Sequence, residues 1–94
     1  MYDRERIFER EDWSCVRCER FVLTKGLHPQ IAHRIPNTKS MRRRYGDEVI
    51  DHELNVALVC CLDCNNAIQL TNKPREAEEL AERIKEDLQC NRNT

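Results

Sequence analysis

Two close cysteine pairs constrain this chain more than any other feature. Cys15 and Cys18 are separated by two residues, and Cys64 closes a second pair whose first member is either Cys60 or Cys61. Each spacing lets a tight turn aim two sulfurs at one ion, and two such pairs separated by an intervening segment are typical of a four-thiolate zinc site. Because four thiolates leave no position open for water, we expect this metal to be structural.

Chain length and redox context favour the metal over a disulfide scaffold. At 94 residues the chain supports one domain, residues 1–94, which buries too little surface for the hydrophobic effect alone to stabilise it well. Residues 2–12 are densely charged, and no apolar run is long enough to span a bilayer. We therefore expect a cytoplasmic protein without a membrane partner, whose thiols stay reduced and whose zinc supplies the missing stability.

Apolar, β-branched runs predict three strands in a small α+β fold. These runs are residues 21–23, 30–35 and 56–60. Because side chains alternate along a strand, only one of Cys60 and Cys61 can point at the ion. His33 shares a face with the isoleucines on either side of it for the same reason.

Capping residues and apolar periodicity predict the helices. The expected helical segments are residues 2–13, as a helix or an extended arm, then 38–45, 63–70 with Asp63 as its cap, and about 74–89. Asn65 and Ile68 are three residues apart on one helical face, so we expect Asn65 to face His33. The last helix carries an apolar stripe that covers the core, with a dimer interface as the alternative, and Cys90 beyond it is expected to be a free thiol.

Basic residues gather in the middle of the chain although its formal net charge is only -1. They are Arg34, Lys39, Arg42, Arg43 and Arg44. A run of this kind is often only a solvated helix face. We expect it to hold a nucleic-acid backbone, because phosphate contacts need clustered cations and this cluster lies among the candidate chemical residues.

Three motifs follow one another in a recognisable order. They are Cys15-x-x-Cys18, then Ala32-His33-Arg34-Ile35-Pro36, then Asn55 ahead of an apolar strand that leads to Cys64-Asn65. This pattern resembles the HNH (His-Me finger) endonucleases, particularly small phage-encoded members and junction-resolving relatives with a four-cysteine zinc site. The resemblance covers about residues 15–70. It implies a ββα-metal core with flanking helices, and it favours Cys60 over Cys61 as the zinc ligand.

The resemblance also implies a metal-dependent DNA endonuclease or nickase. His33 would be the general base, Asn55 would hold the loop between the strands by hydrogen bonds, and Asn65 would bind a catalytic Mg²⁺ or Mn²⁺ ion through its carbonyl oxygen. This chemistry is reasonable, since a neutral imidazole accepts a proton near pH 7 and a hard cation stabilises charge on a phosphate. On the residues alone, His33 could equally be a satisfied core histidine, and both asparagines could be turn or helix-start residues.

Ala32 departs from the family pattern, because active members commonly carry Asp, Glu or His there as a metal ligand. Either Asp51 or His52 would then reach in from the loop at residues 51–55, or His33 itself would be the ligand while another group serves as base, or the ion would be held weakly with more water. The alternative function is a non-catalytic, zinc-stabilised DNA-binding or phage accessory module. Further candidate partners are a second copy of the chain and a phage packaging protein.

Overall fold

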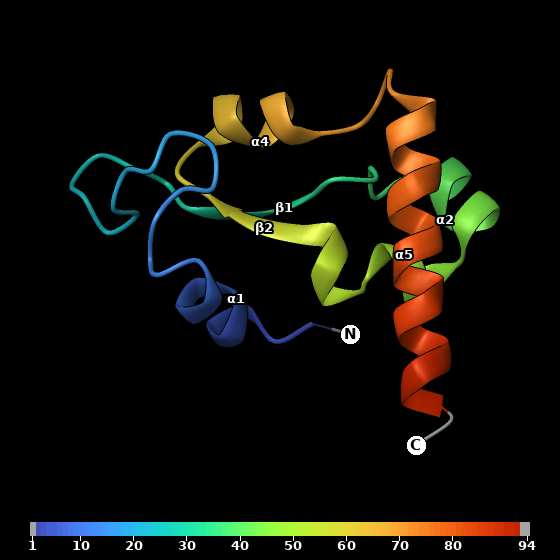
Figure 1. Ribbon diagram of the computed structural model, residues 1–94. Coiled ribbons are helices and arrows are strands. Elements are labelled where there is room, and N and C mark those ends of the chain that lie inside the picture. The colour runs from blue at the N-terminus through green and yellow to red at the C-terminus, as the bar shows by residue number, and fades with distance from the viewer. Residues whose placement is uncertain (1, 93–94) are drawn as a thin grey trace.

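The computed structural model describes residues 2–92, and a two-stranded antiparallel sheet lies among its helices (Figure 1). Strand β1 spans Gln30–His33 and strand β2 spans Val56–Val59, with His33 paired to Val56. β1 is shorter than predicted because the N–H of Ile35 donates to the side chain of Asn55 instead of continuing the ladder. The sheet and its surrounding helices confirm the prediction of a small mixed α+β fold.

Helices cover both faces of this sheet (Figure 1). Helix α4, Leu62–Ile68, packs against β1 and β2 on one face, and helix α1, Arg4–Arg10, packs against β2 from the other. Paired residues of an antiparallel ladder project to the same face, and successive residues alternate. Ala32 and its partner Ala57 therefore lie on the α4 face, whereas His33 lies on the α1 face.

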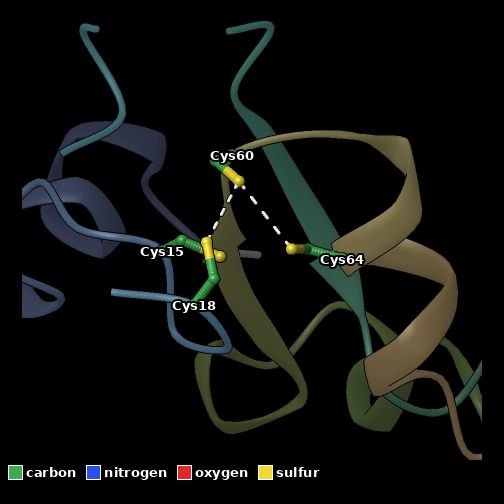
Figure 2. Close-up of side chains that lie close together, drawn as sticks. All are labelled: Cys15, Cys18, Cys60 and Cys64. Carbon is green, nitrogen blue, oxygen red and sulfur yellow. Dashed lines mark hydrogen bonds between the residues drawn. The ribbon is translucent and has the colours of Figure 1, made fainter. Parts of the chain in front are cut away.

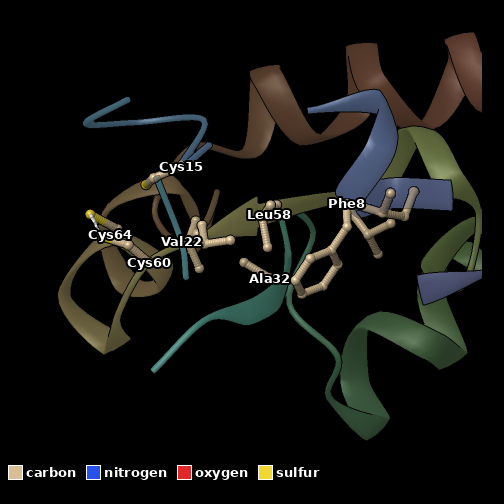
Figure 3. Close-up of a cluster of buried hydrophobic side chains, with 10 residues drawn as sticks. Phe8, Cys15, Val22, Ala32, Leu58, Cys60 and Cys64 are labelled. Carbon is tan, nitrogen blue, oxygen red and sulfur yellow. Dashed lines mark hydrogen bonds between the residues drawn. The ribbon is translucent and has the colours of Figure 1, made fainter. Parts of the chain in front are cut away.

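Two clusters of buried side chains form the core. The first fills the space between α1, the sheet and the cysteine pairs, and Ile7 and Leu58 are fully buried in it (Figure 3). The second lies between helix α2, Lys39–Tyr45, helix α3, Asp47–Ile50, and the long helix α5, Pro74–Arg92. The sheet connects the two clusters, so one end of the molecule carries the cysteines and the other carries α5.

Helix α5 stands beside α2 at this second end (Figure 1). The apolar stripe predicted for this helix is buried in the second cluster through Ala77, Ala81 and Ile84. The stripe therefore packs within the chain. No helix in residues 2–92 is long and apolar enough to cross a membrane.

Local chemistry sets the ends of the short helices. Thr38 accepts a hydrogen bond from the N–H of Met41 at the start of α2, and Gly46 ends that helix with φ +94°, a conformation that costs glycine little. Helix α4 begins after Cys61, two residues earlier than a cap at Asp63 would place it. Asp63 instead lies in the first turn, where its carboxylate suits the positive end of the helix dipole.

Two segments differ from their predicted form. Residues 21–23, predicted as a strand, make a single antiparallel bridge between Ser14 and Phe21, because the partner segment leaves the extended conformation at Asp12 and Trp13, where φ is +56°. Val22 is buried there, but Phe21 and Leu23 are 53% and 61% exposed. The predicted loop at residues 51–55 contains a 3₁₀ helix, η1, at Glu53–Asn55.

Candidate functional site

Four cysteines converge between the first hydrophobic cluster and the surface (Figure 2). They are Cys15, Cys18, Cys60 and Cys64, and their sulfur atoms all lie within 4.8 Å of one another. The Cys60 sulfur is 3.4 Å from that of Cys18 and 3.7 Å from that of Cys64. A tetrahedral ion with sulfur ligands at about 2.3 Å requires sulfur atoms about 3.8 Å apart, so these four side chains could hold one metal ion.

Backbone hydrogen bonds fix the turn that carries the first pair. The N–H of Cys15 donates to the carbonyl of Arg20 at 2.8 Å, and the N–H of Glu19 donates to the carbonyl of Cys15 at 2.9 Å. The N–H of Val16 donates to the carbonyl of Leu58 at 2.9 Å, which docks this turn on the free edge of β2. The second pair needs no such loop, because one cysteine follows β2 directly and the other lies in the first turn of α4.

The four thiols differ in how readily they ionise. Burial opposes ionisation of Cys15, but the backbone N–H groups of Cys18, Arg17 and Cys60 outweigh it and lower the pKa of Cys15 to about 6. Burial and the Cys18 thiol raise the pKa of Cys60, so this sulfur keeps its proton unless a cation replaces it. Cys15 is therefore ready to bind a cation as a thiolate, whereas Cys60 becomes a thiolate only when a cation binds.

Cys61 and Cys90 lie outside this cluster. Cys61 caps α4, and its sulfur is 3.7 Å from that of Cys60 but is not one of the four that converge. Cys90 is an exposed free thiol on α5. The structure thus selects Cys60 over Cys61, a choice that the spacing alone left open.

His33 lies at the end of β1 in a largely enclosed position. The Tyr2 ring packs edge-on against the imidazole with the ring centres 5.9 Å apart, and the Nε2 atom is 3.9 Å from the Oδ1 atom of Asp51. Among the described side chains, those of residues 2–90, this Nε2 is the one buried nitrogen or oxygen without a hydrogen-bond partner. Burial lowers the pKa of His33, against the opposing charge of Asp51, so the ring is neutral at pH 7.

Asp51, and not His52, is the loop residue next to His33. Arg42 donates to both carboxylate oxygens of Asp51, at 2.7 and 3.1 Å, and it lowers the pKa of Asp51. His52 points elsewhere: its Nε2 atom is 2.9 Å from the Asp87 carboxylate, and its Nδ1 atom accepts the N–H of Leu54. A neutral imidazole therefore faces an ionised, arginine-bound carboxylate.

Asn55 is fully buried and bridges the two ends of the connection between the strands. Its side-chain oxygen accepts the N–H of Ile35 at 2.8 Å, and its amide nitrogen donates to the carbonyls of Ile35 and Ile50 at 3.2 and 3.0 Å. These bonds are of the kind that the family resemblance assigns to this position. All three join the Asn55 side chain to backbone groups, so they support the connection between the strands directly.

Asn65 lies away from His33. Its amide nitrogen donates to the side-chain oxygen of Gln30 at 2.7 Å, and its oxygen accepts from Gln69 at 3.0 Å. Both Asn65 and the side chain of Gln30 are on the α4 face of the sheet, whereas His33 is on the α1 face. The expected approach of Asn65 to His33 is therefore not seen.

The residues predicted to bind a catalytic divalent ion consequently do not fit one. His33 has Asp51 beside it but no third ligand, and Asn65 has only amide neighbours. Among the described residues, the four-cysteine cluster is the one group of three or more His, Cys, Asp or Glu side chains close enough to share an ion. Hard divalent cations prefer oxygen ligands, so that sulfur cluster does not serve them.

No protein-family model, curated protein or solved structure matches this chain. The resemblance to HNH endonucleases therefore stays a prediction from the sequence motifs.

The predicted nucleic-acid-binding residues divide into two groups. Arg42 binds Asp47 and Asp51, and Arg44 binds Glu78, so these two charges are largely neutralised within the chain. The side chains of Arg34, Lys39 and Arg43 are exposed and form none of the ion pairs seen in the described part of the chain.

Arg17 contacts the cysteine cluster, although the sequence pattern did not single it out. Its guanidinium donates to the Cys64 sulfur at 3.6 Å, and this contact raises the pKa of Arg17. The sequence does carry a signal for this contact, since Arg17 lies between Cys15 and Cys18. A cation at that position is close to the thiolates of any metal centre.

Proposed function

We propose that this chain is a zinc-stabilised endonuclease of the HNH type that hydrolyses phosphodiester bonds in DNA, with His33 as the general base. The observation that carries the proposal is the Nε2 atom of His33, which is buried and has no hydrogen-bond partner. A polar atom left unpaired in this way costs free energy, and such exceptions are more common where a group is reserved for chemistry. The sequence motifs around His33 supply the substrate class.

The surroundings of His33 suit proton transfer. A neutral imidazole can take a proton from a water molecule that attacks a phosphate, and the lowered pKa of His33 keeps the ring in this neutral form at pH 7. The Asp51 carboxylate, 3.9 Å away, then stabilises the imidazolium that forms. Because Nε2 is buried, water reaches it only after a local opening, and the edge-on contact with Tyr2 is the one that we expect to open.

Zinc is the ion that we assign to the four cysteines. All-sulfur ligation with tetrahedral spacing is typical of structural zinc, and four thiolates leave no open coordination position. The role assigned to this ion is to tie the turn at residues 15–18 to the junction of β2 and α4. No reaction step passes through it.

A plasmid-nicking assay tests the proposed activity. Purified protein is incubated with supercoiled plasmid and either Mg²⁺ or Mn²⁺, beside a His33→Ala variant and a His28→Ala control at an exposed histidine. We expect nicking by the wild type and the control, and a rate lower by about a hundredfold or more in His33→Ala, since a general base contributes that much. Equal nicking by all three proteins would remove His33 from the mechanism.

A non-catalytic DNA-binding module is the second candidate, and the position of Asn65 favours it. The amide that should hold the catalytic ion is engaged with Gln30 and Gln69, and Ala32 supplies no ligand beside it. The exposed cations at Arg34, Lys39 and Arg43 would still hold a phosphate backbone. Salt-sensitive DNA binding without nicking under either ion would decide for this function.

A further inference from the structure

We infer that a surface hollow between Arg17 and Arg34 binds one phosphate group of the DNA backbone. The hollow has a volume of about 250 Å³, and its other lining residues are Val16, Ala57 and Ile68. It lies on the α4 face of the sheet, beside the four-cysteine cluster. The inference rests on the proposed action on DNA. The sequence pattern assigned Arg34 to the nucleic-acid backbone, and the hollow adds Arg17 to the same contact.

Both arginines project from backbone that is held firmly. The N–H of Arg34 donates to the carbonyl of Asn55 at 2.8 Å, and the carbonyl of Arg34 accepts from the N–H of Leu70 at 2.7 Å. The turn that carries Arg17 is docked on β2 through Val16, and its flanking cysteines would be locked by the metal ion. A site built on fixed backbone loses little conformational entropy when a ligand binds.

The charge in this hollow is of one sign. No carboxylate lines it, whereas a neighbouring hollow, which Arg34 also lines, includes Glu76 and Glu79 beside Arg83 in its lining. A third hollow combines Lys85 with two acidic residues of α3. An anion that enters the Arg17–Arg34 hollow therefore meets two cations and no carboxylate in the lining. Each of the other two hollows has acidic residues in its lining.

Arg17 keeps donors for a ligand although it also contacts Cys64. That contact, at 3.6 Å, uses one of its terminal nitrogens, and a guanidinium carries five N–H donors in a planar fork. The fork matches the oxygen atoms of a phosphate, which it can bind through two parallel hydrogen bonds. Thiolates of the metal centre would offset part of the Arg17 charge, so Arg34 is the stronger of the two contacts.

The floor of the hollow explains why it suits a phosphate better than a base or a protein side chain. Val16, Ala57 and Ile68 offer no side-chain hydrogen-bonding group, so nothing there reads a base edge. An apolar floor also strengthens the attraction between the guanidinium groups and an anion, because it excludes part of the solvent. The contact would position the DNA without selecting a sequence.

DNA-binding measurements test this inference separately from cleavage. Fluorescence anisotropy of a labelled duplex is followed over a range of salt concentrations without Mg²⁺ or Mn²⁺, so no nicking occurs. The variants are Arg17→Gln and Arg34→Gln, and the control is Arg75→Gln, whose side chain is 92% exposed on α5. Zinc content is measured for every variant, so a damaged metal centre is recognised.

We expect Arg34→Gln to weaken binding by about tenfold and Arg17→Gln by a smaller factor, each with the slope of log affinity against log salt reduced by about one. Arg75→Gln should bind as the wild type does. Wild-type affinity and slope in both hollow variants, with duplex binding intact, would overturn the phosphate site and leave the proposed function standing. A wild-type chain that binds no duplex at any salt concentration would overturn both.

Discussion

Burial of a single imidazole links the stability of this chain to pH. The pKa of His33 in the folded chain lies below its ordinary value of 6.5, mainly because the ring is buried. As the pH falls below 6.5, the unfolded chain therefore takes up a proton that the folded chain resists, and the free energy of unfolding decreases. The stabilisation from the neutral ring is present above this pH and is lost below it.

Urea denaturation at pH 7 and pH 5 measures this effect. We expect the wild type to lose more unfolding free energy between the two values than a His33→Gln variant, which cannot ionise. A His28→Gln control, at an exposed histidine, should behave like the wild type. The same loss in all three proteins would show that another group causes the pH dependence.

Asn55 is the residue whose removal should be most costly among the polar side chains described. Asn55→Ala leaves the N–H of Ile35 and the carbonyls of Ile35 and Ile50 without their partner in a buried position. Unsatisfied buried groups cost about 1–3 kcal/mol each, so we expect a loss of about 3 kcal/mol or more in unfolding free energy. Chemical denaturation of this variant and of an Asn66→Ala control, which is exposed, measures the difference.

Helix α5 stabilises the end of the molecule that lies farthest from the cysteines. Ile84 is fully buried between this helix and the helices α2 and α3. Ile84→Ala should reduce the unfolding free energy by about 3 kcal/mol, through the lost burial and the cavity that remains. Glu82→Ala is the control, because Glu82 is two residues before Ile84 and on the exposed side of the helix. It should change the unfolding free energy by less than about 0.5 kcal/mol in the same denaturation experiment.

The elements that the sequence predicts well are those with a strong local signal. Thr38 and Gly46 bound α2 as expected, and the apolar stripe of α5 is buried, because capping chemistry and helical periodicity act over a few residues. The segment at residues 21–23 has the composition of a strand, but its pairing with the neighbouring segment stops at the single bridge between Phe21 and Ser14. Pairing is a property of the tertiary fold, so the sequence of one segment cannot show it.

The same distinction holds at the candidate site. Cys15, Cys18 and Cys64 were predictable from their spacing, whereas the choice of Cys60 over Cys61 depends on how the end of β2 is oriented. The bond between Asn65 and Gln30 joins residues 35 positions apart and has no local signal. The sequence left open whether Asp51 or His52 would approach His33. The end of α3 places Asp51 there.

At the scale of the whole molecule, the four-cysteine cluster brings residues 15–18 next to residues 60–64, and the proposed zinc ion would link these distant parts of the chain. Removing zinc with a chelator should unfold the first cluster, with a loss of folding free energy on the order of 10 kcal/mol. Circular dichroism follows the unfolding, and re-addition of zinc should reverse it. A chain that keeps its spectrum and its denaturation midpoint without metal would contradict the structural role.

Cysteine variants identify the ligands in the same protein. Cys15→Ser and Cys60→Ser should lose the bound equivalent of zinc, measured by elemental analysis, since each removes one of the four converging sulfurs. Cys61→Ser and the exposed Cys90→Ser should keep it. Retention of a full equivalent by Cys60→Ser together with loss by Cys61→Ser would reverse the assignment.

The Asn55 bridge also determines which chemistry each face of the sheet can offer. Its carbonyl and side chain hold residues 34 and 35, and so fix β1 against β2. Slippage of the pairing by one position would exchange the directions of His33 and Arg34, because neighbours in a strand point to opposite sides. The imidazole would then meet the hollow beside α4, and the guanidinium would meet the aspartate. One buried amide thus keeps the residues proposed for proton transfer and for phosphate binding on separate surfaces of a sheet only two strands wide.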